Sequence, residues 1–296
     1  MAIAKRIFLF IAVNLLVVVT ISILLSVLGV KPYITAYGID YWSLMIFCLV
    51  WGFGGAFISL GLSRIMAKWM MGVQIIDPRD SDSRSQQLVQ IVHQLAKSAG
   101  MRVMPQVGIY DSPDVNAFAT GPTKNRALVA VSSGLLARMN RGQLEGVLGH
   151  EVAHITNGDM VTMTLVQGVV NAFVMFIARV IAFALSQNVK EENRHMVHFL
   201  AVIVLEIVLS ILGAIVVAFF SRMREFRADK EGARLAGRDK MIDALRGLQR
   251  VFDPHTSDDH ASVATLKISG KSGSFLALFS THPPLELRIQ KLEAGY

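Results

Sequence analysis

Four long apolar stretches place the strongest constraint on the fold of this chain. They cover about residues 7–30, 41–62, 160–185 and 196–220. Each is long enough to cross the ~30 Å hydrocarbon core of a bilayer as a helix. Hydrophobic residues make up 53% of the sequence, more than a soluble domain of this size normally carries. We therefore predict a mainly α-helical membrane protein with four transmembrane or membrane-associated helices.

The third and fourth stretches differ from the first two because they contain ionisable side chains. Arg179 lies in the third stretch and Glu206 in the fourth. A charge inside a membrane span is costly unless it faces protein or water. We predict that Arg179 and Glu206 pair across the two helices. The alternative is that these helices lie in the membrane interface or line a polar cavity.

In the polar part of the chain, residues 150–154 read His-Glu-Val-Ala-His, which is the spacing of a metal site. Histidines four residues apart on a helix project from one face, so both imidazoles can reach one metal ion. Glu151 can then take a proton from a water molecule activated by that metal. Asn140 as N-cap and Gln143 at the capping-box position predict the start of the helix. The alternative is two structural histidines beside an exposed glutamate.

A zinc hydrolase needs a third protein ligand and an open position for water. Glu225 and Asp229 are four residues apart and therefore share a helical face. We predict that Glu225 binds the metal while Asp229 accepts the free ring N–H of a metal-binding histidine. The alternative is an acidic pair on a solvated helix face beside arginines.

The order of these motifs resembles the gluzincin family of membrane zinc peptidases, which includes the HtpX-type proteases and the CAAX prenyl endopeptidases. The resemblance extends over nearly the whole chain and includes the N-terminal hairpin and segments 114–121, 149–154, 157–162, 225–229 and 281–284. It implies an α+β zinc peptidase domain with one Zn²⁺ per chain. By position, it makes His150, His154 and Glu225 the zinc ligands. It also makes Glu151 the general base and Asp229 the partner behind a zinc ligand.

Three further residues receive roles from the resemblance. His282, in a His-Pro motif, corresponds to a residue near the substrate carbonyl, where it would stabilise the oxyanion. Asn116 corresponds to a position that holds the substrate backbone. Arg288, six residues beyond His282, stands where the family has an arginine near the site, and we expect it to contact substrate. The alternatives are that His282 is a surface turn residue and that Asn116 only shapes a turn.

We divide the chain into an N-terminal transmembrane hairpin, two catalytic segments, and the apolar helices between them. The hairpin covers residues 1–63, and the apolar helices cover residues 159–221. The two catalytic segments are residues 64–158 and 222–296. Hydrophobic periodicity predicts helices over 83–98, 134–139, 240–251 and 285–292 and strands over 106–110 and 127–131. The stretch 253–273 is polar and reads as irregular. We expect an extended substrate to pair with strand 127–131.

Basic residues gather before the first apolar stretch, after the second and after the fourth. The positive-inside rule therefore places both termini and the active site in the cytoplasm. We expect a multi-pass protein of the bacterial cytoplasmic (inner) membrane. The net charge of +7 fits an anionic membrane surface, and the basic residues form no single patch that would suit a nucleic acid.

The resemblance implies a zinc-dependent endopeptidase that cleaves misfolded or damaged membrane proteins in stress response and quality control. Two alternatives come from other functional classes. One is a narrow-specificity processing peptidase, and the other is a catalytically silent zinc-binding membrane scaffold. The presence of Glu151 argues against the scaffold, because a structural zinc site has no use for a base.

Overall fold

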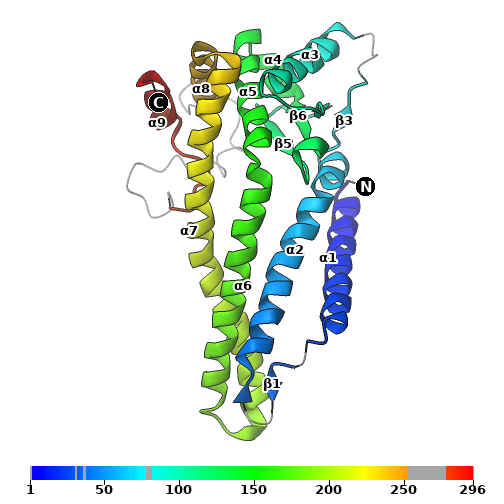
Figure 1. Ribbon diagram of the computed structural model, residues 1–296, viewed down its shortest axis with the longest axis vertical. Coiled ribbons are helices and arrows are strands. Elements are labelled where there is room, and N and C mark those ends of the chain that lie inside the picture. The colour runs from blue at the N-terminus through cyan, green and yellow to red at the C-terminus, as the bar shows by residue number, and fades with distance from the viewer. Residues whose placement is uncertain (1, 31, 36–37, 78–81, 253–277, 296) are drawn as a thin grey trace. The chain divides into compact units, whose positions relative to one another are not determined.

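The computed structural model of this chain describes residues 2–30, 32–35, 38–77, 82–252 and 278–295 (Figure 1). The helices in chain order are α1 (Ala2–Val27), α2 (Tyr41–Met70), α3 (Ser83–Ser98), α4 (Ser133–Arg138), α5 (Arg141–Asn157), α6 (Asp159–Ser186), α7 (Arg194–Ala236), α8 (Arg238–Phe252) and α9 (Leu285–Glu293). The strands are β1 (Ile34–Thr35), β2 (Gly38–Ile39), β3 (Gln74–Ile75), β4 (Gln106–Tyr110), β5 (Ala117–Thr120) and β6 (Leu128–Ser132). The predicted irregular stretch 253–273 lies outside the described residues.

The chain divides into two compact units. The first, which we call the helical unit, comprises residues 1–59 and 163–217, and the second, the mixed unit, comprises residues 60–162 and 218–296. Each unit is discontinuous in sequence, because the chain leaves the mixed unit through α6 and returns to it through α7.

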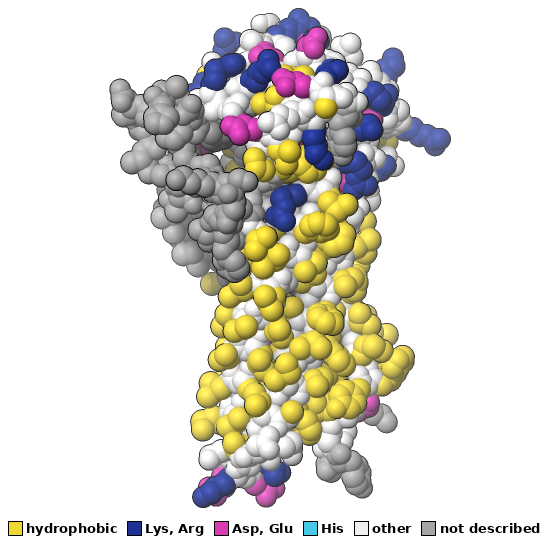
Figure 2. Space-filling model, turned by 90° about the vertical axis from the view of Figure 1, so that its left-hand side faces the viewer, with side chains coloured by type: hydrophobic (Ala, Val, Ile, Leu, Met, Phe, Trp, Pro, Cys, Tyr) yellow, Lys and Arg dark blue, Asp and Glu magenta, His cyan; other side chains and the backbone are white. Residues whose placement is uncertain are grey.

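Three helices in the described part of the chain are long and apolar enough to cross a membrane. They are Tyr41–Met70, Asp159–Ser186 and the helical segment Glu191–Ala236. In α1, the described apolar portion is the shorter segment Leu15–Val27, so three of the four predicted spans are recovered. Hydrophobic side chains cover much of the helical surface seen in Figure 2. Apolar groups exposed in this way need lipid rather than water around them.

The predicted ion pair within the helical unit is confirmed. Nη1 of Arg179 on α6 contacts Oε1 of Glu206 on α7. The guanidinium also donates to the carbonyl oxygen of Met175 at 3.1 Å and lies 5.4 Å from the ring centre of Phe47. The two charges therefore compensate each other between helices instead of facing lipid separately.

The mixed unit contains a four-stranded sheet with the order β3-β4-β6-β5. Strands β4 and β6 are parallel, whereas β3 and β5 run antiparallel to their neighbours. The sequence predicted β4 with its observed bounds and placed β6 one residue early. It missed β3 and β5, which have two and four residues and are too short to show an alternating pattern.

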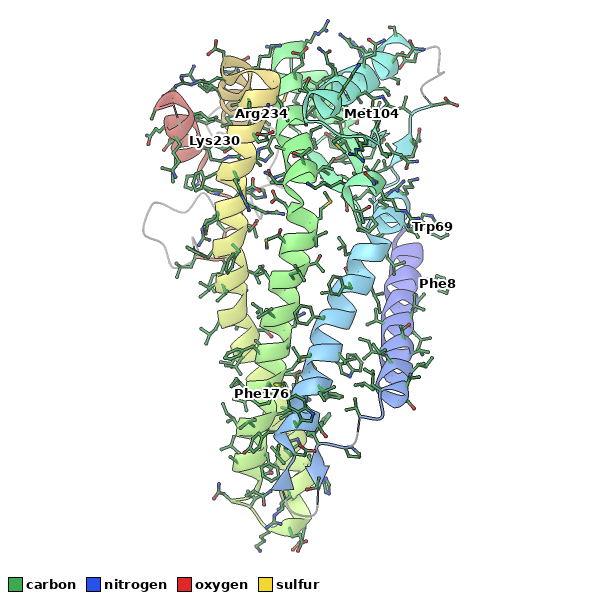
Figure 3. All side chains as sticks on the ribbon, viewed as in Figure 1. Phe8, Trp69, Met104, Phe176, Lys230 and Arg234 are labelled. Carbon is green, nitrogen blue, oxygen red and sulfur yellow. The ribbon has the colours of Figure 1, made fainter. Side chains whose placement is uncertain are left out.

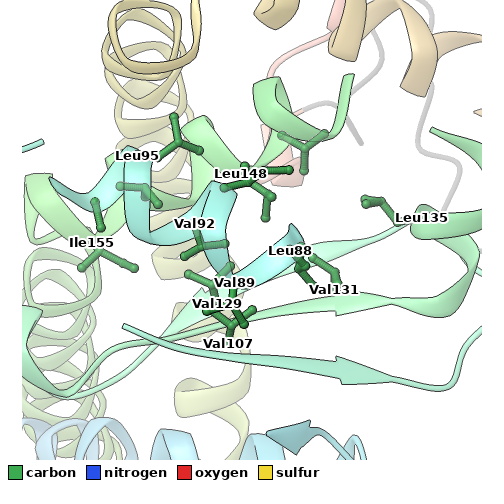
Figure 4. Packing of buried hydrophobic residues seen from close by; sticks show 14 of the residues in the cluster. Leu88, Val89, Val92, Leu95, Val107, Val129, Val131, Leu135, Leu148 and Ile155 are labelled. Carbon is green, nitrogen blue, oxygen red and sulfur yellow. The ribbon is translucent and has the colours of Figure 1, made fainter. Parts of the chain in front are cut away.

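Both faces of the sheet are covered, so every residue of β6 is buried. Val129 and Val131 join one apolar cluster, whereas Leu128 and Ala130 join a second cluster that contains Tyr110. This division follows from the alternation of side chains along a strand. Figure 4 shows the first cluster, to which α3 contributes Leu88, Val92 and Leu95, and α5 contributes Leu148, Val152 and Ile155.

The expectation that substrate pairs with strand 127–131 is wrong. Strand β6 lies between β4 and β5, so both of its edges are already hydrogen bonded. A five-residue run that is buried on both faces is typical of a central strand. Strand β5 is the outermost strand on that side of the described sheet.

Glycines allow α5 to approach its neighbouring helices closely. A Cβ atom on Gly146 would lie 2.5 Å from the carbonyl oxygen of Lys240 and 2.8 Å from the Cβ of Ala244, both on α8. A Cβ atom on Gly149 would lie 3.1 Å from the carbonyl oxygen of Gly232 on α7. The missing side chains therefore set the distance between the helix that carries the histidines and its two partners.

We expect Gly146→Ala to lower the free energy of unfolding of the detergent-purified protein. Overpacking of this kind costs about 1–3 kcal/mol, which offsets the gain of about 1 kcal/mol in helix propensity. Gly142→Ala is the matched control, because its nearest neighbour would be the Asn140 side chain at 3.4 Å. Thermal unfolding measures both variants, and equal midpoints would contradict the packing argument.

Candidate active site

Helix α5 carries the His150–Glu151–His154 motif and begins where the sequence predicts. The Asn140 side chain accepts a hydrogen bond from the Gln143 amide at 2.9 Å, and the Gln143 side chain accepts one from the Asn140 amide at 3.2 Å. The helix ends at Gly158, whose φ of 72° is the left-handed conformation that glycine adopts readily. Both ends of the helix are therefore fixed locally, and the second histidine stands in its last turn.

His150, His154 and Glu225 converge in the mixed unit. One ligand atom from each of the three residues lies within 4.8 Å of the other two. The Nε2 atoms of the two histidines are 3.1 Å apart, and they lie 3.4 Å and 3.3 Å from the carboxylate oxygens of Glu225. Glu225 comes from α7, so the tertiary fold joins positions that are far apart in the sequence.

The donor set fits a zinc ion. Two imidazole nitrogens and one carboxylate oxygen are a common protein ligand set of catalytic zinc, which leaves the fourth position open. Glu225 is fully buried, and Nε2 of His154 lies 3.3 Å from its Oε1 atom. A buried carboxylate is costly unless positive charge or hydrogen-bond donors compensate it, and a cation held between the three residues would add to that compensation.

A carboxylate holds the other ring nitrogen of each histidine. Nδ1 of His150 lies 2.9 Å from Oδ1 of Asp229, and Nδ1 of His154 lies 2.7 Å from Oδ2 of Asp159. Such a carboxylate favours the tautomer with the proton on Nδ1, which leaves the Nε2 lone pair for a metal. The two contacts therefore point both Nε2 atoms at the same place.

Sequence reasoning anticipated Asp229 but gave no role to Asp159. The sequence signal for the contact between Asp159 and His154 is local. Asp159 directly follows Gly158, the residue at which α5 ends and the chain turns toward α6. This turn brings the first residue of α6 back against the second histidine of the motif. An acidic residue directly after a helix-ending glycine, five positions beyond a metal-binding histidine, could have suggested the contact.

The carboxylates control the protonation of the two histidines. Burial lowers the pKa of His154, but hydrogen bonds with Asp159 and Glu225 outweigh burial and raise the pKa to about 9. Burial also lowers the pKa of His150, and hydrogen bonds with Asp229 and Glu225 again give a net increase. A metal binds only the unprotonated nitrogen, so a metal that bound here would compete with protons for these two rings.

Arg288 lies behind the cluster on α9. Its Nε and Nη2 atoms donate to the two carboxylate oxygens of Asp229 at 2.7 Å and 2.6 Å. Nη2 also lies 3.5 Å from Nδ1 of His150, and the side chain is only 7% exposed. A bidentate arginine fixes the plane of a carboxylate. The structure thus places this guanidinium on Asp229, whereas the sequence led us to expect substrate contact.

His282, Glu151 and Asn116 differ in how closely the structure brings them to the cluster. Nδ1 of His282 lies 2.8 Å from Oε2 of Glu225, while 61% of its side chain is exposed. Glu151 is half-buried, and its charge contributes to the raised pKa of His154. The backbone of Asn116 exchanges hydrogen bonds with Ser132, which ties it to β6 rather than to the cluster.

Comparison with known proteins agrees with this geometry. Residues 82–295 match the family model described as Peptidase family M48. This chain belongs to peptidase family M48. Over 297 residues it is 58% identical to "Protease HtpX homolog" of Bacillus velezensis, with 98% of this chain and 99% of the relative covered. It is 52% identical over 296 residues to "Protease HtpX" of Thioalkalivibrio sulfidiphilus, with the same coverage.

A solved structure shares the fold. The crystal structure of S. mikatae Ste24p superimposes with a TM-score of 0.62 and 17% sequence identity, covering 98% of this chain and 64% of that chain. The predicted resemblance to membrane zinc peptidases is therefore confirmed. This chain is therefore a membrane metalloprotease, and the M48 family to which it belongs is a family of zinc metallopeptidases.

We expect Asp159→Asn to weaken zinc binding about 10–100-fold, as is typical when the partner behind a metal-binding histidine is lost. Competition with a chromophoric chelator, carried out on the full-length protein in detergent, measures the affinity. Asp243→Asn on α8 is the control, because Asp243 is paired with Arg250 away from the cluster. Wild-type zinc affinity in Asp159→Asn would show that Asp159 does not orient His154.

Proposed function

We propose that this metalloprotease is a zinc-dependent endopeptidase that hydrolyses misfolded or damaged membrane proteins in the bacterial cytoplasmic membrane. The observation that supports this most strongly is the convergence of two imidazoles on the buried carboxylate of Glu225, with Glu151 on the same helix as the imidazoles. A structural zinc site requires four protein ligands and no base. This cluster offers three ligands, and the carboxylate of Glu151 remains available as a base.

We assign His150, His154 and Glu225 as the ligands of one zinc ion per chain. When bound, zinc would polarise the scissile carbonyl and increase the acidity of the attacking water. Asp229 and Asp159 hold the two imidazoles in the required tautomer.

The remaining side chains would move protons and bind the developing charge. Glu151 takes the proton of the attacking water and later delivers it to the leaving amine. His282, whose exposed ring borders the cluster, donates a hydrogen bond to the oxyanion. Arg288 acts as a positioning residue, because it reaches the site through Asp229.

An extended substrate would pair with the outer edge of β5, at the start of which Asn116 is exposed. Pairing with a sheet edge recognises the peptide backbone and tolerates varied side chains. This mode suits a quality-control protease, which meets many unrelated sequences. In this proposal β5 takes the place of β6 as the strand that pairs with substrate, because both edges of β6 are already hydrogen bonded within the sheet.

We propose that segments 64–158 and 222–296 form one catalytic domain on the cytoplasmic side of the membrane. The grouping of residues 60–162 with 218–296 into one compact unit supports the single domain. The distribution of lysine and arginine around the apolar stretches supports the orientation.

Cysteine labelling can test the orientation, because the one native cysteine, Cys48, is buried. We expect a membrane-impermeant maleimide to label Asn188→Cys, in the exposed α6–α7 connection, in sealed right-side-out vesicles. Lys97→Cys on α3 should react only after permeabilisation. The reverse labelling pattern would contradict the proposed orientation.

We expect Glu151→Gln to reduce cleavage of casein by about 10²–10⁴-fold, while stoichiometric zinc remains bound. The reaction uses the detergent-purified chain after removal of metal and reloading with zinc. Glu192→Gln, at an exposed position between α6 and α7, is the control and should retain activity. Undiminished cleavage by Glu151→Gln would exclude its role as general base.

The cleavage products distinguish a quality-control protease from a processing peptidase with narrow specificity. We expect cuts at many positions in casein and in thermally damaged membrane proteins. One cut at a fixed position in a single substrate would instead indicate a processing peptidase.

A further inference from the structure

Arg222 on α7 holds the segment that leads to His282. Its Nη1 atom donates hydrogen bonds to the carbonyl oxygen of Leu278 at 3.0 Å and to the carbonyl oxygen of Ser280 at 2.7 Å. Hydrogen bonds from a charged donor are roughly twice as strong as those between neutral groups. One guanidinium therefore fixes two backbone groups of residues 278–284, which we call the His282 segment.

Contacts within the His282 segment carry this constraint to the histidine. The Ser280 hydroxyl donates a hydrogen bond to the carbonyl oxygen of His282 at 2.7 Å. The residue that Arg222 binds through its carbonyl group therefore also holds the backbone of His282. Two prolines, Pro283 and Pro284, follow directly, and the ring of each fixes its own φ. The backbone at His282 thus has little freedom of its own once Ser280 is held.

One face of α7 contacts the His282 segment and the helix that follows it. Arg222, Glu225 and Asp229 are separated by three and four residues, so they lie on the same side of α7. Oε2 of Glu225 lies 2.8 Å from Nδ1 of His282. Asp229 accepts hydrogen bonds from Arg288 on α9, which Figure 3 shows beside α7. His282 is therefore held between two anchor points on one helix, Arg222 before it in the chain and Asp229 after it.

We propose that Arg222 is a positioning residue that holds His282 beside the candidate zinc cluster. This role rests on the proposed function, in which His282 donates a hydrogen bond to the oxyanion. Such a donor must lie within hydrogen-bond reach of the oxyanion, and a misplacement of about 1 Å can reduce the rate about 10²-fold. The His282 side chain is mostly exposed. Its position therefore depends on its contact with Glu225 and on how firmly its backbone is held.

A double-mutant cycle between Arg222 and His282 tests this role in the zinc-loaded, full-length protein in detergent. We expect Arg222→Gln to lower kcat for casein cleavage about 10²-fold while KM changes little. His282→Ala should lower kcat about 10²–10³-fold. In the His282→Ala protein, Arg222→Gln should cost less than about a further twofold, because the two residues act as one unit. Equal fold-losses in the two backgrounds would overturn the proposal, since a purely structural Arg222 would affect both alike.

Two further variants separate the hydrogen bonds from a general loss of stability. Arg222→Lys keeps an ammonium group that can donate to a carbonyl oxygen, so it should be more active than Arg222→Gln, and equal losses in the two would contradict the proposal. If Arg222→Gln lowers the thermal midpoint, Ser280→Ala decides the outcome, because it leaves α7 unchanged and removes the hydroxyl that donates to His282. Ser280→Ala should lower kcat about five- to tenfold, the effect of one lost hydrogen bond, and should have no further effect combined with His282→Ala.

A spin label measures the His282 segment directly and does not depend on proteolysis. A nitroxide is attached to Thr281→Cys, an exposed position next to His282, in a Cys48→Ala background. We expect Arg222→Gln to increase the mobility of the label, whereas Arg138→Gln, which removes an exposed cation of α4, should not. Unchanged mobility in Arg222→Gln, or an equal increase in the control, would overturn the proposal. Failure of the wild type to cleave casein would instead contradict the proposed function, and the label would still show whether Arg222 holds the segment.

Discussion

The buried carboxylate of Glu225 is the interaction on which the arrangement of the mixed unit depends. An isolated charge in such a place would cost several kcal/mol, so its surroundings must compensate it. His150, His154 and His282 supply that compensation from α5 and from the segment before α9. The absence of side chains at Gly149 and Gly232 allows α5 and α7 to come close enough for these contacts. The close approach of α5 and α7 at these glycines therefore determines both how the two helices pack and how the site residues meet.

Helices that build the cluster also continue into the helical unit. Asp159 is the first residue of α6, and Glu225 lies within α7, which is apolar over much of its length. Two groups of the cluster are thus attached to rigid helices instead of loops. A site on regular elements holds its geometry more accurately than one on loops.

The features predicted from the sequence are those set by local rules. The capping box at Asn140 and Gln143 needs only the spacing of two residues, and the bounds of α3 and β4 follow from periodicity. The pairing of Arg179 with Glu206 followed from the cost of an unpaired charge in an apolar helix. Each of these inferences needs either the spacing of residues that are close in the sequence or one rule about the free-energy cost of a buried charge.

The features that the sequence did not reveal depend on tertiary contacts. Strand β5 is recognisable only by its pairing with β6, and the central place of β6 depends on that pairing. The position of Arg288 on Asp229 likewise requires α9 to lie behind α5 and α7. Residue type alone left that arginine free to face either a substrate or a carboxylate.

The charges around the cluster also bear on its state without metal. Each of its carboxylates has an arginine near it, Arg224 at 3.7 Å from Glu225, Arg227 at 3.8 Å from Asp159 and Arg288 at 2.6 Å from Asp229. In zinc fingers the metal itself supplies the folding free energy, and these domains unfold when it is removed. Here the arginines can hold the carboxylates in place by charge. Zinc binding at this cluster, as proposed above, would then replace protons within a site whose carboxylates the protein's own charges already compensate.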